Sequence, residues 1–438
     1  MVLIYEDGRF RGELDSSNRR YRGRFEYNNG DVFEGEWREE KRYRGTMLYA
    51  NGDKFEGEWA NGEETARGIL TFADGRRYEG PFKNNKVHGK GVMYFANGDK
   101  LEGEWRKGKR VRGVYTFSDG NVMIGKFKDG KFCGKGSFTK PNGTKYNGYL
   151  KDGKMEGKGT ITYADGKRTV GYFKDSKLIG KATITYPDGK KYQGEIVDGL
   201  WHGNGFVKLP NGSTYRGGFR KGSLHGYGIL KMSKKSESDF LMYQGQFKFG
   251  KMSGRGKLIY KNGERREGIF KDGLLNGKGV IFFADGGKYE GMLKDGLMHG
   301  KGKCVFANGV EYEGDWVCGE MDGKGAMWWS DGYRYIGEWK NGKRHGEGWY
   351  YAVGKISYKG SYVEDVRNGY GVEEYPSGNK YEGEWVNGRR QGKGRYTWAK
   401  GSQYTGEFND DLRDGYGTYT DVDGKKYEGR WKQDEFLG

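Results

Sequence analysis

Apolar and polar residues alternate along the chain in short runs that return at a fixed interval. In the stretch 381–409, YEGEWVNGRRQGKGRYTWAKGSQYTGEFN, an aromatic residue, a glycine and a second large residue occupy every other position, and the same arrangement returns 23 residues later at Tyr404. Alternation with a period of two predicts β-strands, because successive side chains of a strand point to opposite faces. Self-similarity at a fixed period predicts a repeat architecture.

A glycine between two large residues marks each copy of the repeat. The pattern (aromatic)-x-Gly-x-(apolar) occurs nineteen times, and of its eighteen intervals fifteen are 23 residues, two are 22 and one is 28. The empty position at each glycine is expected to let an aromatic ring from the neighbouring strand lie flat. These structural repeat glycines include Gly35, Gly57, Gly80, Gly103, Gly148, Gly194, Gly291, Gly314, Gly337, Gly383 and Gly406.

The large residues that flank the repeat glycines are expected to form aromatic ladders along one face of a sheet. The residues predicted to form this ladder or a groove beside it are Trp37, Trp59, Tyr78, Trp105, Tyr192, Tyr312, Trp316, Trp339, Tyr381, Trp385, Tyr404 and Trp431.

Turn signals separate the alternating runs. Asp-Gly and Asn-Gly pairs, such as Asp188-Gly189 and Asn308-Gly309, recur between them and predict type I′ hairpin turns, in which both central residues need positive φ. The sequence therefore predicts an all-β fold: an elongated single-layer antiparallel β-meander of about nineteen stacked hairpins, forming a rod-shaped or groove-shaped repeat array.

The face opposite the aromatic residues is predicted to be polar. Glutamates flank the repeat glycine on many first strands, as Glu382 and Glu384 do, and lysines such as Lys158 and Lys393 occur on second strands. Pairs of opposite charge on neighbouring strands contribute roughly 0.2–1 kcal/mol each. Such pairs are consistent with a high total charge and a moderate net charge.

The segments YEGEWVNGRRQGKGRYTW and YEGMLKDGLMHGKGKCVFANG resemble the MORN repeat, a family named for membrane occupation and recognition. The resemblance extends over essentially the whole chain. Proteins built almost wholly of these repeats resemble radial-spoke-head and other axonemal components of cilia, and cortical or basal scaffolds of protists. The resemblance thus implies a scaffold, while the family name implies contact with membranes.

The repeat register divides the chain into four parts. Residues 1–9 are expected to be an incomplete N-terminal repeat that supplies only a second strand, and residues 10–232 a first array. Residues 233–242 are expected to be an insertion loop, and residues 243–438 a second array that ends in a half repeat. The polar, serine-rich insertion is interpreted as a tolerated surface loop, with a docking loop or phosphorylation site as the alternative.

The chain carries 78 Lys and Arg residues against 60 Asp and Glu residues, a net charge of +18. Interspersed charges favour a solvated mixed face, but arginines crowd near the N-terminus and are candidates for contact with an anionic surface. Those arginines are Arg19, Arg20, Arg22, Arg24, Arg42 and Arg44. The three cysteines form no CxxC motif and are interpreted as free thiols. Without a signal peptide or a long apolar run, the chain is expected to be cytoplasmic and to lack a transmembrane segment.

The sequence offers no motif for catalysis, cofactor binding or metal binding. All five histidines occupy one repeat position, and none has a cysteine or carboxylate at metal-ligand spacing. Gly-Lys-Gly recurs without the context of a phosphate-binding loop. Interleaved aromatic and basic residues could serve single-stranded nucleic acid, but ladder packing accounts for the aromatic residues. We therefore expect no enzyme activity, no cofactor and no nucleic-acid partner.

A lone sheet with one apolar face has no second layer to cover that face. Part of the face is expected to be covered by ring-over-glycine packing, and the rest by a partner or a second copy. The sequence thus favours a cytoskeletal scaffold, most of all in a ciliary or flagellar axoneme, that binds structural proteins through the apolar face and edge strands. Homodimers or end-to-end strand pairing are further expectations. The alternative is a peripheral membrane–cytoskeleton tether that binds acidic phospholipids.

Overall fold

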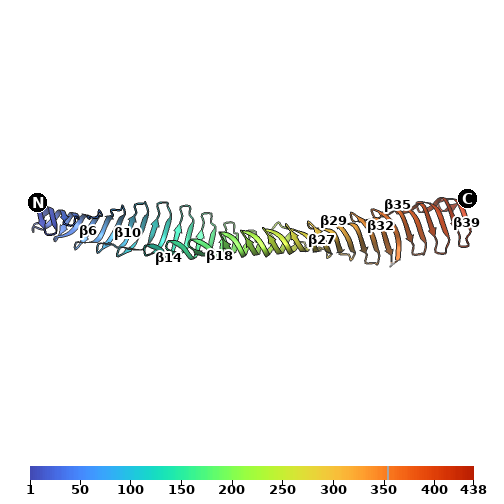
Figure 1. Cartoon of the computed structure of the whole chain (residues 1–438), viewed down its shortest axis with the longest axis horizontal. Coiled ribbons are helices and arrows are strands. Elements are labelled where there is room, and N and C mark those ends of the chain that lie inside the picture. Colours follow the sequence, from blue (N-terminus) through green and yellow to red (C-terminus); the bar gives the residue numbers. More distant parts are fainter. Residues whose placement is uncertain (353–354) are drawn as a thin grey trace. The chain divides into compact units, whose positions relative to one another are not determined.

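The computed structural model describes residues 1–352 and 355–438, without the side chains of residues 64–66 and 355–356. This part of the chain contains forty strands and no helix. It forms two compact units, Met1–Pro210 and Asn211–Gly438. Within each unit, strands that are consecutive in the sequence lie side by side, in the order of the colour scale (Figure 1). The predicted all-β hairpin meander is confirmed.

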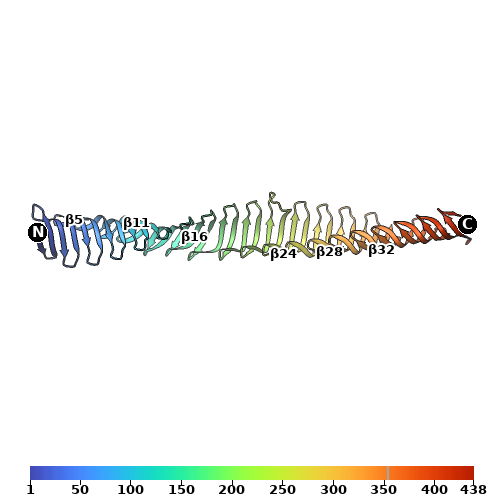
Figure 2. The same ribbon diagram turned by 90° about the horizontal axis from the view of Figure 1, so that it is seen from above.

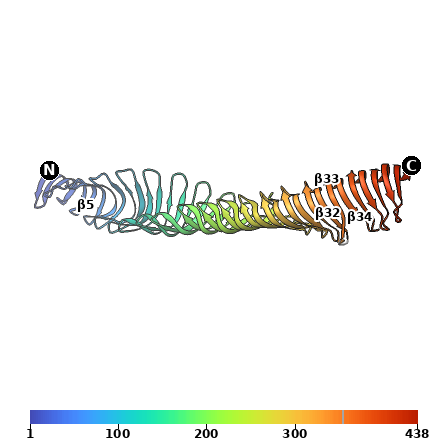
Figure 3. The same cartoon turned by 45° about the vertical axis from the view of Figure 1, so that its right-hand side comes forward.

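The N-terminal unit is one antiparallel meander in which each strand pairs with the next, except that β10 returns to β8 beside the short β9. Its strands are curved in the view of Figure 3. They are β1 Val2–Tyr5, β2 Gly8–Leu14, β3 Arg20–Tyr27, β4 Val32–Arg38, β5 Lys41–Leu48, β6 Lys54–Ala60, β7 Glu63–Thr71, β8 Arg77–Lys83, β9 Lys86–Val87, β10 Gly89–Tyr94, β11 Lys100–Arg106, β12 Lys109–Thr116, β13 Val122–Lys128, β14 Lys131–Thr139, β15 Lys145–Lys151, β16 Lys154–Thr162, β17 Arg168–Lys174, β18 Lys177–Thr185, β19 Lys191–Val197 and β20 Leu200–Lys208.

The C-terminal unit repeats this arrangement, and its turns follow two opposite margins of its sheet (Figure 2). The predicted insertion loop lies between its second and third strands, where β23 begins at Phe240, so the last three residues of 233–242 lie in a strand. The strands are β21 Thr214–Arg220, β22 Ser223–Lys231, β23 Phe240–Lys248, β24 Lys251–Tyr260, β25 Arg265–Lys271, β26 Leu274–Phe282, β27 Lys288–Lys294, β28 Leu297–Val305, β29 Glu311–Val317, β30 Glu320–Trp328, β31 Arg334–Lys340, β32 Lys343–Ala352, β33 Lys355–Val363, β34 Val366–Glu374, β35 Lys380–Val386, β36 Arg389–Thr397, β37 Gln403–Asn409, β38 Leu412–Thr420, β39 Lys426–Lys432 and β40 Glu435–Phe436.

Glycines of neighbouring strands lie opposite one another and form a row that crosses the sheet. Gly314 of β29 pairs with Gly302 of β28 on one side and with Gly325 of β30 on the other. A Cβ atom at Gly314 would stand 2.5 Å from the Cα atom of Gly325 and 2.5 Å from the hydroxyl oxygen of Tyr312. No side chain fits at this position, and the constraint is steric because the backbone of Gly314 does not adopt a positive φ.

The aromatic rings meet above the glycine row. Residues four apart on a strand are separated by about 13 Å along the backbone, yet the ring centroids of Tyr312 and Trp316 are 5.1 Å apart in an edge-to-face contact. The two rings lean toward each other across the empty position at Gly314. We expected a ring from the neighbouring strand over each glycine; here Tyr312 lies over Gly314 of its own strand and over Gly325 of the next.

A β-bulge follows the repeat glycine and frees one backbone carbonyl from the ladder. In β35 the register shifts between Gly383 and Trp385, and the hydroxyl of Tyr381 donates a hydrogen bond of 2.9 Å to the carbonyl of Glu384. A buried carbonyl left unpaired would cost about 1–3 kcal/mol. The contact therefore explains the use of tyrosine rather than phenylalanine in these copies. The same contact recurs at Tyr146, Tyr192, Tyr215, Tyr243, Tyr289, Tyr312, Tyr335, Tyr358 and Tyr404.

Two kinds of turn alternate along the meander, and this differs from the prediction. The turn inside a hairpin has two residues with positive φ, as at Asn341 (48°) and Gly342 (78°), which fits type I′. The turn between hairpins is longer. At Asn308-Gly309 only the glycine has positive φ, at 81°, and the NH of Phe306 donates to the carbonyl of Val310. The pairs that we predicted as type I′ turns are therefore of this second kind.

Side chains link each turn to the corresponding turn of the next hairpin. The carboxylate of Asp53 accepts a hydrogen bond of 2.8 Å from the NH of Ala73, and Asn379 accepts one of 3.0 Å from Ala399. On the other margin the carboxylate of Asp411 accepts the NH of Arg390 at 2.8 Å. These contacts fix the stacking of hairpins at both margins of each unit.

Burial of the tyrosine hydroxyls makes the fold sensitive to high pH. Burial raises the pKa of Tyr215, Tyr243 and Tyr289 to about 12 in each case, above the value of about 10 in an unfolded chain. A group with a raised folded-state pKa contributes stability that is complete below the unfolded pKa and is lost as pH rises through the folded pKa. We expect the free energy of unfolding to fall between about pH 10 and 12.

The measurement is a pH titration that follows tyrosinate absorbance and β-sheet circular dichroism together. The two signals should change together above about pH 11 for the buried tyrosines, because ionisation of a buried hydroxyl is linked to loss of the surrounding sheet. Ionisation of all tyrosines near pH 10 with an intact sheet would contradict the expectation.

Candidate binding surface

The aromatic ladder residues are buried within the chain itself. Tyr381 is 0% exposed and Trp385 is 2% exposed, and the other predicted ladder residues are buried to a similar degree. We expected packing within the chain to cover only part of the apolar face; for the ladder residues it covers nearly all of each side chain. Rings on neighbouring strands cover one another edge to face, as Tyr358 and Trp385 do with centroids 5.6 Å apart. A second layer is therefore not needed to keep these rings dry.

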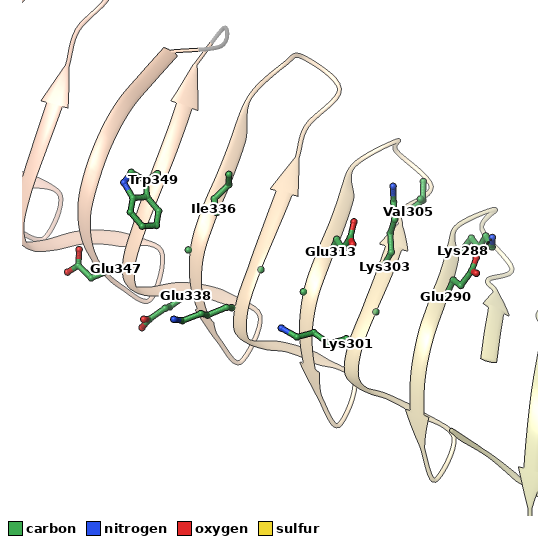
Figure 4. A pocket seen from close by; sticks show the side chains of 15 residues that line it. Lys288, Glu290, Lys301, Lys303, Val305, Glu313, Ile336, Glu338, Glu347 and Trp349 are labelled. Atoms are coloured by element: carbon green, nitrogen blue, oxygen red, sulfur yellow. Dashed lines mark hydrogen bonds and ion pairs between the residues drawn. The ribbon is translucent and has the colours of Figure 1, made fainter. Parts of the chain in front are cut away.

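The opposite, polar face holds a groove whose floor is the glycine row. In the C-terminal unit Gly302, Gly314, Gly325 and Gly337 lie along this floor. Two rows of side chains flank it (Figure 4). In each hairpin the first strand carries the repeat glycine, as β29 carries Gly314, and the second strand carries the glycine that pairs with it, as β30 carries Gly325. Row A holds the residue before the glycine on each first strand and the residue after the glycine on each second strand. Row B holds the residue after the glycine on each first strand and the residue before the glycine on each second strand. Row A of this groove contains Lys303, Glu313, Ile336 and Trp349, and row B contains Lys301, Lys324, Glu338 and Glu347.

Several charges in this groove are paired within the chain. The Nζ atom of Lys301 lies 2.7 Å from a carboxylate oxygen of Asp315, and the NH of Lys324 donates to the same carboxylate at 3.0 Å. Partial burial acts to raise the pKa of Asp315, but these two contacts outweigh it and hold the pKa below its usual value. Row B of the C-terminal unit is thus electrostatically balanced.

The groove of the N-terminal unit has the same floor but a different charge pattern. Gly80, Gly91, Gly103 and Gly113 form part of its floor. Beyond Arg112, row B continues through a line of exposed residues that we call the cationic strip. The cationic strip consists of Lys126, Lys135, Tyr149, Lys158, Tyr172 and Lys181.

The sequence analysis did not single out the cationic strip, although a signal for it is present. Most first strands carry glutamate beside the repeat glycine, whereas three in succession, β13 (VMIGKFK), β15 (KYNGYLK) and β17 (RTVGYFK), carry none. It is also absent from β21, β23 and β33. Counting net charge over the whole chain hides this local absence of acids.

The predicted arginine cluster is divided by the structure. Arg20 has a side chain only 13% exposed; it pairs with Glu40 at 2.6 Å and lies 4.2 Å from the ring centroid of Trp37. Arg42 donates to the carbonyl of Gly62 at 2.8 Å. Both side chains therefore support the fold. The exposed members of the cluster are Arg19, Arg22, Arg24 and Arg44.

Little in the described residues points to chemistry. Among them there is no group of three or more His, Cys, Asp or Glu side chains that could hold a metal ion. Cys133, Cys304 and Cys318 are free thiols, and burial raises the pKa of Cys304 to about 11, which keeps that thiol protonated. A search of the described residues for helices long and apolar enough to cross a bilayer found none.

Comparison with solved structures gives distant similarities. The TCP10 domain of Danio rerio CPAP is 17% identical over 50% of this chain and 94% of that domain, with a TM-score of 0.24. The TCP domain of Drosophila melanogaster SAS-4, solved with a proline-rich motif of Ana2, is 12% identical over 48% of this chain and 95% of that domain, with a TM-score of 0.19. At this level of similarity neither structure informs on function. No curated protein matches the chain.

Comparison with protein families gives a repeated match. The model of the MORN repeat matches residues 55–76, 78–100, 102–122, 124–145, 146–168, 192–214, 215–236, 243–265, 267–288, 289–311, 312–332, 335–355, 358–380, 381–403 and 404–426. The hairpin meander continues through unmatched residues 1–54 and 169–191, where β1–β5 and β17–β18 lie. The matches cover well over half of the chain, their boundaries follow the hairpins, and the chain belongs to the MORN repeat family.

Proposed function

We propose that the chain is a non-catalytic scaffold of a cytoskeletal assembly, which binds protein partners along the polar face of its hairpin array. One observation carries the proposal: the rings of the aromatic ladder are buried within the chain, whereas the polar face exposes a glycine-floored groove flanked by two rows of side chains. Repeat arrays use such continuous surfaces to hold extended partners.

The favoured setting is a ciliary or flagellar axoneme, in a role similar to that of a radial-spoke-head protein. The support is indirect: the family match recurs from residue 55 to residue 426 and leaves little of this chain for any other domain. The alternative is a membrane–cytoskeleton tether. It is favoured by the exposed side chains of Arg22 and Arg44, which lie on either side of Glu36 on the polar face.

The experiment is detergent extraction of ciliated cells that express the full chain with a fluorescent tag. A scaffold should stay with the axonemes or another cytoskeletal fraction after the membranes are removed. Release of the whole signal with the membranes would contradict the proposal.

A vesicle assay tests the tether independently. Purified protein is sedimented with vesicles that contain or lack acidic phospholipid, at low and high salt. The scaffold proposal expects no sedimentation with either vesicle. Binding that requires acidic lipid and is lost both at high salt and in the variant Arg22→Gln/Arg44→Gln would favour the tether, because exposed charge contacts are screened by salt.

A further inference from the structure

The six consecutive strands β13–β18 carry an uneven balance of charge. Each of the six holds two Lys or Arg residues, and together they hold a single carboxylate, that of Glu156. Nearby aspartates such as Asp152 and Asp175 lie in the turns. The face of these strands is therefore strongly cationic, unlike the balanced groove of the C-terminal unit.

The cationic strip runs across these strands as one line beside the glycine row. Lys135 pairs in register with Tyr149, and Lys158 with Tyr172. The two tyrosines are 48% and 58% exposed, and tyrosine is a residue type that is enriched at interfaces. Row A opposite the strip carries no charge; it consists of Ile124, Ser137, Asn147, Thr160, Val170 and Thr183.

The polar groups of the cationic strip have few partners within the described residues; Lys135 Nζ lies 6.0 Å from the ring centroid of Tyr149. None of its four lysines forms an ion pair with a described carboxylate, and neither tyrosine hydroxyl has a described hydrogen-bond partner. Glu156 lies opposite Tyr149, but its carboxylate accepts a hydrogen bond of 3.3 Å from the NH of Asp175. The groups that could bind a ligand are thus available to solvent.

In the C-terminal unit, lysine and tyrosine residues of row B bind carboxylates. There Lys301 pairs with the carboxylate of Asp315 at 2.7 Å. The hydroxyl of Tyr370 donates to a carboxylate oxygen of Glu382 at 3.0 Å, and Tyr416 makes the equivalent contact with Glu428 at 3.3 Å. In each tyrosine contact the hydroxyl of a row B residue reaches a row A carboxylate across the glycine row. The cationic strip has the same lysine and tyrosine side chains but lacks the acids.

We propose that the cationic strip binds an extended acidic segment of a partner protein, whose carboxylates take the place of the acids that β13–β18 lack. The inference rests on the proposed scaffold function and identifies the chemistry of one partner. From Lys126 to Lys181 the strip crosses five strand spacings of about 4.8 Å, about 24 Å in all, which equals roughly seven extended residues. The glycine floor leaves room for the backbone of that segment.

A polypeptide fits the strip better than a lipid surface or a nucleic acid does. Within the groove, the charge lies in row B and row A is uncharged, which matches a single extended chain that lies between the two rows. The equivalent side chains elsewhere in this chain bind carboxylates.

The test is fluorescence anisotropy of the purified full chain with a labelled peptide of roughly eight glutamates, which is about one residue longer than the strip. Binding should be saturable and weaken with salt. The variant Lys135→Gln/Lys158→Gln/Lys181→Gln should bind at least about tenfold more weakly, because three charge contacts are lost. Tyr149→Phe/Tyr172→Phe, which removes only hydroxyl groups, should weaken binding about two- to fivefold.

The matched control is Lys301→Gln/Lys303→Gln/Lys324→Gln, which removes the same charge from the groove of the C-terminal unit. Its peptide affinity should stay within about twofold of wild type. All substituted side chains are exposed or partly exposed, and circular dichroism checks that each variant keeps its sheet. Absence of peptide binding, or equal binding by wild type and the first triple variant, would overturn the proposal.

Competitors separate the other classes of ligand. Vesicles rich in phosphatidylserine and single-stranded DNA are added to the peptide complex, and neither should displace the peptide at comparable charge concentration. Tighter binding of either competitor through the three strip lysines would also overturn the proposal. The anisotropy assay uses purified protein, so absence of peptide binding can contradict this inference even if the tagged chain stays with the cytoskeleton. Conversely, detergent extraction can contradict the scaffold while peptide binding remains.

Discussion

Replacing Tyr312 by alanine is expected to lower the local free energy of unfolding around β29 and β30 by about 3–5 kcal/mol, as found for large aromatic-to-alanine changes in cores. The side chain is 0% exposed, and its ring lies 5.1 Å from that of Trp316 and 5.3 Å from that of Trp339. Its removal leaves a cavity between three strands and also unpairs the carbonyl of Asp315.

Native-state hydrogen exchange measures this effect, because a repeat array need not unfold in one step. Amides of β29–β31 should lose protection, whereas amides of the N-terminal unit should not. Tyr312→Phe serves as the control. It keeps the ring and removes only the hydroxyl bond of 3.0 Å to Asp315, so its cost should be about 1–3 kcal/mol, with the packing term retained. Equal effects of the two variants would show that ring packing is unimportant there.

Adding one methyl group at Gly314 is expected to cost about 3 kcal/mol, at the upper end of the usual range for overpacking. The new Cβ atom would lie 2.5 Å from the Cα atom of Gly325, 2.5 Å from the hydroxyl oxygen of Tyr312 and 2.7 Å from the carbonyl oxygen of Lys324. Two of these three obstacles are backbone atoms of the neighbouring strand, so the strands must separate locally to relieve the contacts.

Gly125→Ala is the matched control for Gly314→Ala. Gly125 occupies the same repeat position, but Met123 replaces the tyrosine, and the nearest atom to a new Cβ is a ring carbon of Phe132 at 3.2 Å. Thermal unfolding and hydrogen exchange should show a change of less than about 1 kcal/mol for this variant. A comparable loss in both variants would mean that glycine is needed for backbone flexibility rather than for space.

The hairpins were predictable because two-residue alternation and a regular glycine position are local properties of the sequence. The alternation around Tyr381 and Trp385 correctly placed both rings on one face. It could not show that the rings meet across Gly383, because alternation assigns a face and contains no information about how a strand bends. We expected part of the apolar face to stay uncovered because a flat strand would hold the two rings apart and exposed to solvent. In the structure both rings are buried.

The candidate binding surface was less accessible to sequence reasoning. A cluster of arginines attracted attention, but Arg20 packs on Trp37 and pairs with Glu40, contacts that depend on tertiary structure. The cationic strip is cationic because several neighbouring strands lack acidic residues. Lys126 and Lys181 are far apart in the chain, and the strand register is needed to place them in one line.

Each strand of the N-terminal unit pairs only with strands that directly precede or follow it in the chain, apart from the step between β8 and β10 around the short β9. A hairpin can therefore close as soon as its second strand leaves the ribosome, since no segment from later in the chain is required to complete it. Contacts that join residues close in sequence also favour rapid folding. During synthesis, each completed hairpin can therefore pack on the previous one, and its aromatic rings are exposed to solvent only briefly.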